Sequence, residues 1–178
     1  MRGKTVAVLG AGTIGLLVLA VLRAHGARRV VVTDVMATKR DAARALGADD
    51  VVDADAPDAA EQVRAALGES ADIVVDCVAI EPTVRQAVAV ASKGGTVVVG
   101  VPAADVSVPL ALVQDHQIRI QGSATYVLED YAESIRLLQI GAVCAADIVT
   151  ASLPMEQVAD VFDLSASGHH IKVLITLG

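Results

Sequence analysis

Short runs rich in valine alternate with helical segments along the chain, and this alternation restricts the fold more than any other feature. The valine runs lack a polar residue at every second position, which indicates strands that are covered on both faces. Strands separated by helices predict right-handed crossovers and a parallel sheet. We therefore predict an α/β fold, a doubly wound and mainly parallel sheet of six strands with helices on both faces. The expected strands are Thr5–Leu9, Val30–Asp34, Val51–Asp53, Asp72–Asp76, Thr96–Gly100, Ile118–Gln121 and, last in the chain, Ile171–Thr176.

Glycines support this division of the chain, because one follows each expected helix. A residue in the left-handed conformation closes a helix, and glycine adopts that conformation without steric cost. The expected helices are Thr13–His25, Ala37–Leu46, Pro57–Leu67, Pro82–Ser92, Glu129–Ile140 and Met155–Ser165. The glycines that follow them are Gly26, Gly47, Gly68, Gly94, Gly141 and Gly168.

Composition excludes several classes of function. Apolar residues make up 54% of the chain and charged residues 20%, which excludes a disordered chain. Aromatic residues are only 2% and the net charge is −7, so a nucleic acid is not an expected partner. Cys77 and Cys144 lie far apart and form neither a zinc-type spacing nor a disulfide framework, which favours a reduced, cytoplasmic setting.

The stretch Thr5–Leu22 carries no charge and follows a basic N-terminus, so it resembles a signal peptide or a short membrane span. The alternative is a buried strand followed by a buried helix. Glycines at regular spacing inside the stretch favour that alternative, and we expect neither secretion nor a membrane partner.

The motif Gly10-x-Gly12-x-x-Gly15 follows the first expected strand and opens the first helix. Gly10 permits a tight turn, Gly12 lets the backbone approach a pyrophosphate, and Gly15 lets the helix pack closely on the sheet. The N-terminus of the helix offers free N–H groups to phosphates, so Thr13 and Ile14 are also candidate contacts. The motif is weak alone, but here a strand precedes it and a helix follows it.

Asp34 ends the second expected strand, nineteen residues after Gly15. A carboxylate there accepts hydrogen bonds from the ribose hydroxyls of adenosine and repels a 2′-phosphate, so NAD is favoured over NADP. The alternative is that Asp34 only caps the next helix. Lys39 and Arg40 could each reach the same ribose and tolerate a 2′-phosphate, although for Arg40 we prefer a solvated first turn of a helix.

Ligands of doubly wound sheets bind beyond the carboxyl ends of the strands. This rule nominates loop residues after three strands, each of which is otherwise an ordinary loop position. The nominated residues are Cys77, Val78 and Ala79, then Val99, Gly100 and Val101, then Ser123, Ala124 and Thr125. Cys77 is more simply interpreted as a small buried apolar residue than as a reactive thiol.

These features together resemble the Rossmann-type cofactor domain of zinc-dependent medium-chain alcohol dehydrogenases, in the polyol and threonine dehydrogenase branch. The matching strings are VAVLGAGTIGLLVLAVLRAHGARRVVVTD (6–34), ALGAD (45–49), ADIVVDCV (71–78), GGTVVVGVP (94–102), IRIQGSATY (118–126) and IKVLIT (171–176). The resemblance implies that Asp34 and Lys39 bind the adenosine ribose and that Ile14 packs under the pyrophosphate turn. It also implies that Val99–Val101 and Ser123–Thr125 flank the nicotinamide.

The same resemblance implies a division into a dinucleotide-binding domain (1–149) and a tail (150–178) that in relatives packs into a catalytic domain. It further implies a homodimer formed near Ile118–Gln121 and the apolar stretch Val106–Val113. The family's N-terminal domain, which holds the catalytic zinc ligands, has no counterpart in this sequence, and Ala79 stands where many relatives have glycine. We therefore name no catalytic residue and no metal ligand.

We expect the NAD(H)-binding portion of an alcohol or polyol dehydrogenase. It should be inactive alone, because an alcohol or polyol substrate needs the zinc-bearing domain. One alternative is a non-catalytic NAD(H)-binding or redox-sensing module, which would share every cofactor residue. Another is an adenosylmethionine-dependent methyltransferase, which does not need the third glycine.

Overall fold

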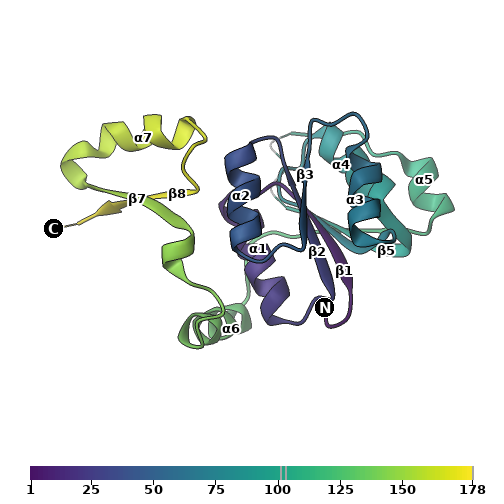
Figure 1. Ribbon diagram of the computed structural model, residues 1–178, viewed down its shortest axis with the longest axis horizontal. Coiled ribbons are helices and arrows are strands. Elements are labelled where there is room, and N and C mark those ends of the chain that lie inside the picture. Colours follow the sequence, from purple (N-terminus) through teal and green to yellow (C-terminus); the bar gives the residue numbers. More distant parts are fainter. Residues whose placement is uncertain (101, 103, 178) are drawn as a thin grey trace.

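Six parallel strands form the central sheet, with helices on both faces (Figure 1). The computed structural model describes residues 1–100, 102 and 104–177. The strand order is β3-β2-β1-β4-β5-β6. The strands are β1 (Thr5–Leu9), β2 (Arg29–Asp34), β3 (Asp50–Asp53), β4 (Ala71–Asp76), β5 (Ala91–Val99) and β6 (Arg119–Gly122). This order reverses direction between β1 and β4, and it confirms the predicted doubly wound fold.

Successive residues of β1 point to opposite faces of the sheet, and each face is covered by its own helices. Val6 and Val8 pack with α1 (Thr13–Ala24) and α2 (Ala37–Ala45). Ala7 and Leu9 pack with α3 (Ala59–Leu67) and α4 (Glu81–Val90). All five side chains of β1 are fully buried, which is why this strand shows no polar alternation.

The uncharged stretch Thr5–Leu22 is therefore the buried strand β1 followed by most of α1. Within the described residues, no helix is both long enough and apolar enough to cross a bilayer. This confirms the preferred interpretation of the stretch as a buried strand followed by a buried helix.

Two further helices complete the part of the chain before residue 140, namely α5 (Leu110–Asp115) and α6 (Leu128–Gln139). The sequence did not predict α5, because its first four residues lie inside the apolar stretch assigned to a dimer contact. Leu112 and Val113 of α5 pack against the core, whereas Leu110 is exposed. Gly94 also departs from the prediction: α4 ends at Val90, and Gly94 lies inside β5, although its φ is positive like those of the other five glycines.

The last part of the chain forms a small unit beside the main sheet (Figure 1). Its elements are the 3-10 turns η1 (Ala145–Asp147) and η2 (Met155–Gln157), the strands β7 (Val149–Pro154) and β8 (Lys172–Thr176), and the helix α7 (Val158–Ala166). β7 and β8 pair in parallel as a separate two-stranded sheet. The expected last strand is thus present but does not join the main sheet, and β7 was not predicted.

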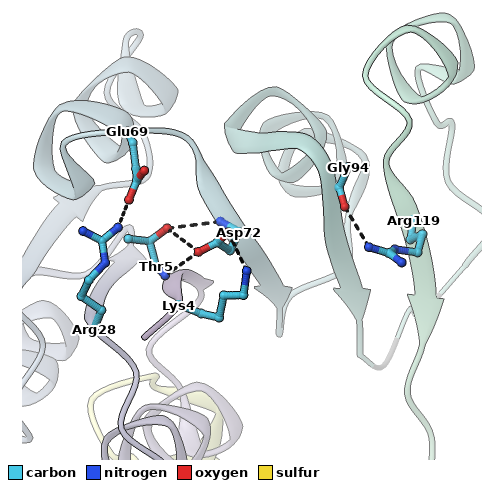
Figure 2. Close-up of polar contacts among 7 residues, drawn as sticks. All are labelled: Lys4, Thr5, Arg28, Glu69, Asp72, Gly94 and Arg119. Atoms are coloured by element: carbon cyan, nitrogen blue, oxygen red, sulfur yellow. Dashed lines mark hydrogen bonds and ion pairs between the residues drawn. The ribbon is translucent and has the colours of Figure 1, made fainter. Parts of the chain in front are cut away.

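A group of polar contacts connects the amino ends of the strands, opposite the edge where ligands bind in such folds (Figure 2). Asp72 accepts hydrogen bonds from the N–H and hydroxyl of Thr5, at 3.0 and 3.3 Å, and pairs with Lys4 at 3.1 Å. Arg28 pairs with Glu69 nearby. Burial would raise the pKa of Asp72, but the bonds from Thr5 and Lys4 outweigh burial and lower the pKa.

We predict that Asp72→Ala lowers the free energy of unfolding by about 1–2 kcal/mol at pH 7, because it leaves two buried groups of Thr5 without an acceptor. The pKa of Asp72 lies below its ordinary value of 3.8 in the folded chain, so its charge stabilises the fold above that pH. This contribution is lost as the pH falls through the lower, folded-state pKa. Urea unfolding should therefore show that the difference in free energy of unfolding between the wild type and Asp72→Ala becomes smaller below pH 3.8.

Asp41→Ala is the matched control, since Asp41 is an exposed carboxylate that pairs only with Arg44 on the same helix. It should change the free energy of unfolding by less than about 0.5 kcal/mol. The prediction would be contradicted if the difference in free energy of unfolding between the wild type and Asp72→Ala stayed constant as the pH fell below 3.8.

Candidate dinucleotide-binding site

A cleft of about 500 Å³ opens at the carboxyl ends of β1, β2 and β4. All nine of its lining residues are among those that the sequence nominated: Gly10, Gly12, Thr13, Ile14, Gly15, Asp34, Lys39, Cys77 and Val78. The cleft lies where the strand order reverses, which is the usual ligand position in an open parallel sheet.

The glycine turn is packed tightly at two of its three glycines. Gly10 has a φ of +93°, and a Cβ added to it would lie 2.6 Å from Cγ2 of Val78. A Cβ on Gly15 would lie 1.8 Å from the carbonyl oxygen of Gly10, so the first turn of α1 rests directly on the turn that precedes it. These two glycines are therefore required by packing.

Gly12 differs from its neighbours, because a Cβ there would meet nothing within 4 Å and its φ of −74° suits any residue. Nothing in the fold requires glycine at this position. The open space in front of Gly12 belongs to the cleft, which is what close approach of a ligand to the backbone needs.

The N-terminus of α1 faces this cleft without a side-chain cap from the described residues. None of the described side chains caps the helix, and its first turn holds no acidic residue. The partial positive charge of the helix end is therefore available to an anion. Ile14, in this first turn, is 56% exposed, so an apolar surface lies beside the N–H groups.

Asp34 is fixed between the glycine turn and the start of α2. Its Oδ2 accepts a hydrogen bond from the N–H of Ala11 at 2.8 Å, and its Oδ1 accepts one from the N–H of Met36 at 2.9 Å. Each carboxylate oxygen has a further lone pair, so the group can still accept bonds from a diol. The sequence placed Asp34 at the end of β2, and the structure brings it into the cleft.

Lys39 and Arg40 follow Asp34 in sequence but are placed differently. Lys39 lines the cleft. Arg40 donates hydrogen bonds to the carbonyl oxygens of Asp34, at 2.7 Å, and Val35, at 2.9 Å, and its side chain is only 16% exposed. The interpretation of Arg40 as a solvated residue is therefore wrong: its guanidinium is bound to the loop that carries Asp34.

The loop after β4 is held by Asp76, a fully buried carboxylate that sequence reasoning did not use. Its Oδ1 accepts hydrogen bonds from the N–H groups of Val78, at 3.0 Å, and Ala79, at 2.9 Å. Ala79 is buried and has a φ of +55°, a backbone conformation that favours glycine. The signal available in the sequence was an aspartate directly after the apolar run Ile73–Val75 of β4.

Cys77 lines the cleft as a protonated thiol. Burial, helped by the negative charge of Asp76, raises the pKa of Cys77 to about 12. A thiol with this pKa is a poor nucleophile at neutral pH, which agrees with its interpretation as a small apolar residue.

The other nominated residues that the structure describes lie at the same edge of the sheet but do not line the cleft. The N–H of Gly100 donates to the carbonyl of Asp76 at 2.9 Å, and the N–H of Ser123 donates to the carbonyl of Val99 at 3.0 Å. Ala124 and Thr125 follow and are exposed. Val101 lies outside the described residues.

Sequence reasoning missed a second, mostly apolar groove of about 330 Å³ between the loops after β2, β3 and β4. Val35 and Ile80 line it, and they are 55% and 47% exposed. The signal that could have found this groove was an apolar residue in each of two loops that follow strands, Val35 after β2 and Ile80 after β4. Val35 of the groove directly follows Asp34 of the cleft in the sequence, so the two hollows lie on either side of the end of β2.

The small C-terminal unit contributes one more missed feature beside the glycine turn. The hydroxyl of Thr13 donates to the carbonyl of Ile171, and both residues line a hollow of about 220 Å³ with Lys172. Thr13 also lines the cleft, so the hollow that contains Lys172 lies next to the glycine turn. Elsewhere in the described ranges, no three His, Cys, Asp or Glu side chains gather as metal ligands, so zinc does not fit these residues.

Comparison with known proteins agrees with this geometry. The model of the family described as zinc-binding dehydrogenase matches residues 13–139. Sorbitol dehydrogenase of Ovis aries is 32% identical over 177 residues, and D-xylulose reductase A of Aspergillus niger is 29% identical over 179 residues. Both matches cover 97% of this chain and 50% of the relative, so the chain spans about half the length of the curated relatives it matches.

Solved structures show the same fold. A protein described as a zinc-binding dehydrogenase from Sinorhizobium meliloti 1021, bound to NADP, is 30% identical with a TM-score of 0.88, and the match covers 99% of this chain and 53% of that one. An alcohol dehydrogenase from E. coli CFT073, complexed with NADH, is 23% identical with a TM-score of 0.90. That match covers 99% of this chain and 53% of the E. coli chain. The chain thus belongs to the zinc-binding dehydrogenase family and corresponds to the cofactor-binding half of its polyol and alcohol dehydrogenases.

Proposed function

We propose that this chain binds NAD(H) in the cleft above β1, β2 and β4, as the cofactor half of a polyol or alcohol dehydrogenase. The carboxylate of Asp34, fixed beside the glycine turn and open to the cleft, is the observation that carries the proposal. When bound, the nicotinamide supplies hydride transfer. The residues of this chain bind and orient the cofactor.

Each part of the cleft suits one part of a dinucleotide. The turn at Gly12 and the N-terminus of α1 would receive the pyrophosphate, with Lys172 as an added cation. Asp34 would accept hydrogen bonds from the adenosine ribose. The apolar groove at Val35 and Ile80 has the position and surface to receive the adenine.

The far end of the cleft would receive the nicotinamide, near Cys77 and Val78, with Val99–Val101 and Ser123–Thr125 as proposed neighbours. A neutral thiol and an apolar side chain there would exclude water from the ring without reacting with it. We further propose that the chain binds the cofactor without turnover. Hydride transfer with an alcohol needs a Lewis acid or proton acceptor at the alcohol oxygen, which would come from outside the described residues.

We predict that calorimetric titration shows NADH binding in the micromolar range and much weaker NADPH binding. Asp34→Ala should weaken NADH binding by about tenfold or more, because it removes the ribose acceptor. Asp41→Ala, which removes an exposed carboxylate from the adjacent helix, should leave NADH binding unchanged. Absence of NADH binding by the wild type would contradict the proposal.

A second prediction separates the two roles of the glycine turn. Gly12→Ala should leave thermal unfolding unchanged, since its Cβ meets nothing, but it should abolish NADH binding by filling the place of the pyrophosphate. Gly15→Ala should destabilise the chain by about 2 kcal/mol or more, because its Cβ would overlap the carbonyl of Gly10. Normal NADH binding by a folded Gly12→Ala variant would argue against the site.

We also propose a homodimer formed through β6, an edge strand whose four residues are all exposed. Light scattering at tens of micromolar should give the mass of two chains. Ile120→Pro, which removes one edge donor, should shift the mass toward one chain. A wild-type chain that is monomeric at this concentration would exclude the proposal.

A further inference from the structure

Arg40 and Asp53 form an ion pair directly behind the residue proposed to recognise the ribose. The Nη2 of Arg40 lies 2.9 Å from Oδ2 of Asp53, while its Nη1 donates to the carbonyls of Asp34 and Val35. The guanidinium therefore binds the backbone of the residue whose carboxylate faces the cleft.

The pair is built into the sheet. Asp34 and Asp53 are register partners at the ends of β2 and β3, so Arg40 joins two neighbouring strand ends. Asp53 is itself oriented, because its Oδ1 accepts a hydrogen bond from the N–H of Asp55 at 3.1 Å. The side chain of Arg40 is only 16% exposed, whereas that of Asp53 is 45% exposed, so the guanidinium is held against the protein and the carboxylate lies at the surface.

The position of Arg40 matters because NAD and NADP differ only at the 2′ position of the adenosine ribose. A carboxylate there selects a free hydroxyl, whereas an arginine side chain accommodates a 2′-phosphate. A guanidinium released from Asp53 would lie next to Asp34, whose carbonyl oxygen it already contacts. Together with Lys39, it would place two cations beside the loop that carries Asp34. The related structures do not decide between the cofactors, since one was bound to NADH and another to NADP.

We propose that Asp53 determines cofactor specificity by holding Arg40 behind the loop, away from the 2′ position, so that the site selects NAD over NADP. The inference rests on the proposed NAD(H) site and names a residue outside the cleft that sets its selectivity. Arg40 acts as a positioning residue in this state, because it fixes the backbone that presents the carboxylate of Asp34.

The test is calorimetric titration of the 178-residue chain with NADH and with NADPH. Asp53→Asn keeps the shape of the side chain and an oxygen for the N–H of Asp55 but removes the charge that binds Arg40. We expect NADPH binding to strengthen by about tenfold, the size of one charge-assisted contact, while the Kd of NADH changes by less than about threefold.

The double variant Asp53→Asn/Arg40→Leu shows whether the effect passes through Arg40. It should bind NADPH as weakly as the wild type. Equal gains in the single and double variants would mean that the charge of Asp53 itself repels the phosphate, and they would overturn the proposal. Thermal unfolding of each variant shows whether the binding data come from folded protein.

Asp41→Asn is the matched control, because it removes one negative charge from the residue after Arg40 without touching the Arg40–Asp53 pair. It should leave the ratio of NADH to NADPH affinity unchanged. An unchanged ratio in Asp53→Asn, with NADH binding intact, overturns this inference alone. Absence of NADH binding by the wild type overturns the proposed function and this inference with it.

Discussion

The first turn of α1 lies against the carbonyl of Gly10, so closely that only glycine fits at position 15. This contact fixes where α1 leaves the sheet and aims its N-terminus into the cleft. It also fixes Ala11, whose N–H holds the carboxylate of Asp34 at 2.8 Å. One contact therefore positions both the helix end and the carboxylate of Asp34, the proposed ribose acceptor, and a change at Gly15 would move both.

Three aspartates at strand ends have different roles around the same edge of the sheet. Asp34 keeps lone pairs free and faces the cleft. Asp53 is occupied by Arg40, behind the loop. Asp76 is fully buried and orders the loop after β4, where it supports the left-handed backbone of Ala79. The residue type is the same in each case, and the hydrogen bonds that surround it decide whether its oxygens are open to the cleft, bound to another side chain or bound to a loop.

The sequence was sufficient to predict an element wherever the local residue pattern agrees with how that element packs. Both faces of β1 are buried, so its valine run predicts the strand, and the glycine spacing predicts the turn and α1. It was insufficient for α5, a helix of six residues, and for β7, whose residues alternate between half-buried and exposed and pair only with β8. The pairing of Arg40 with Asp53 depends on the register of β2 with β3, and the apolar groove depends on three loops meeting. Neither relation exists within a short sequence window.

The most direct test of the account is an amide ¹H–¹⁵N correlation spectrum of the chain titrated with NADH. The account predicts shifts at Ala11–Gly15 and Asp34–Met36, where the backbone N–H groups surround the cleft, and unchanged signals at Lys4, Thr5 and Asp72 on the opposite edge of the sheet. Shifts confined to the C-terminal unit or to α6, with the glycine turn unaffected, would contradict it.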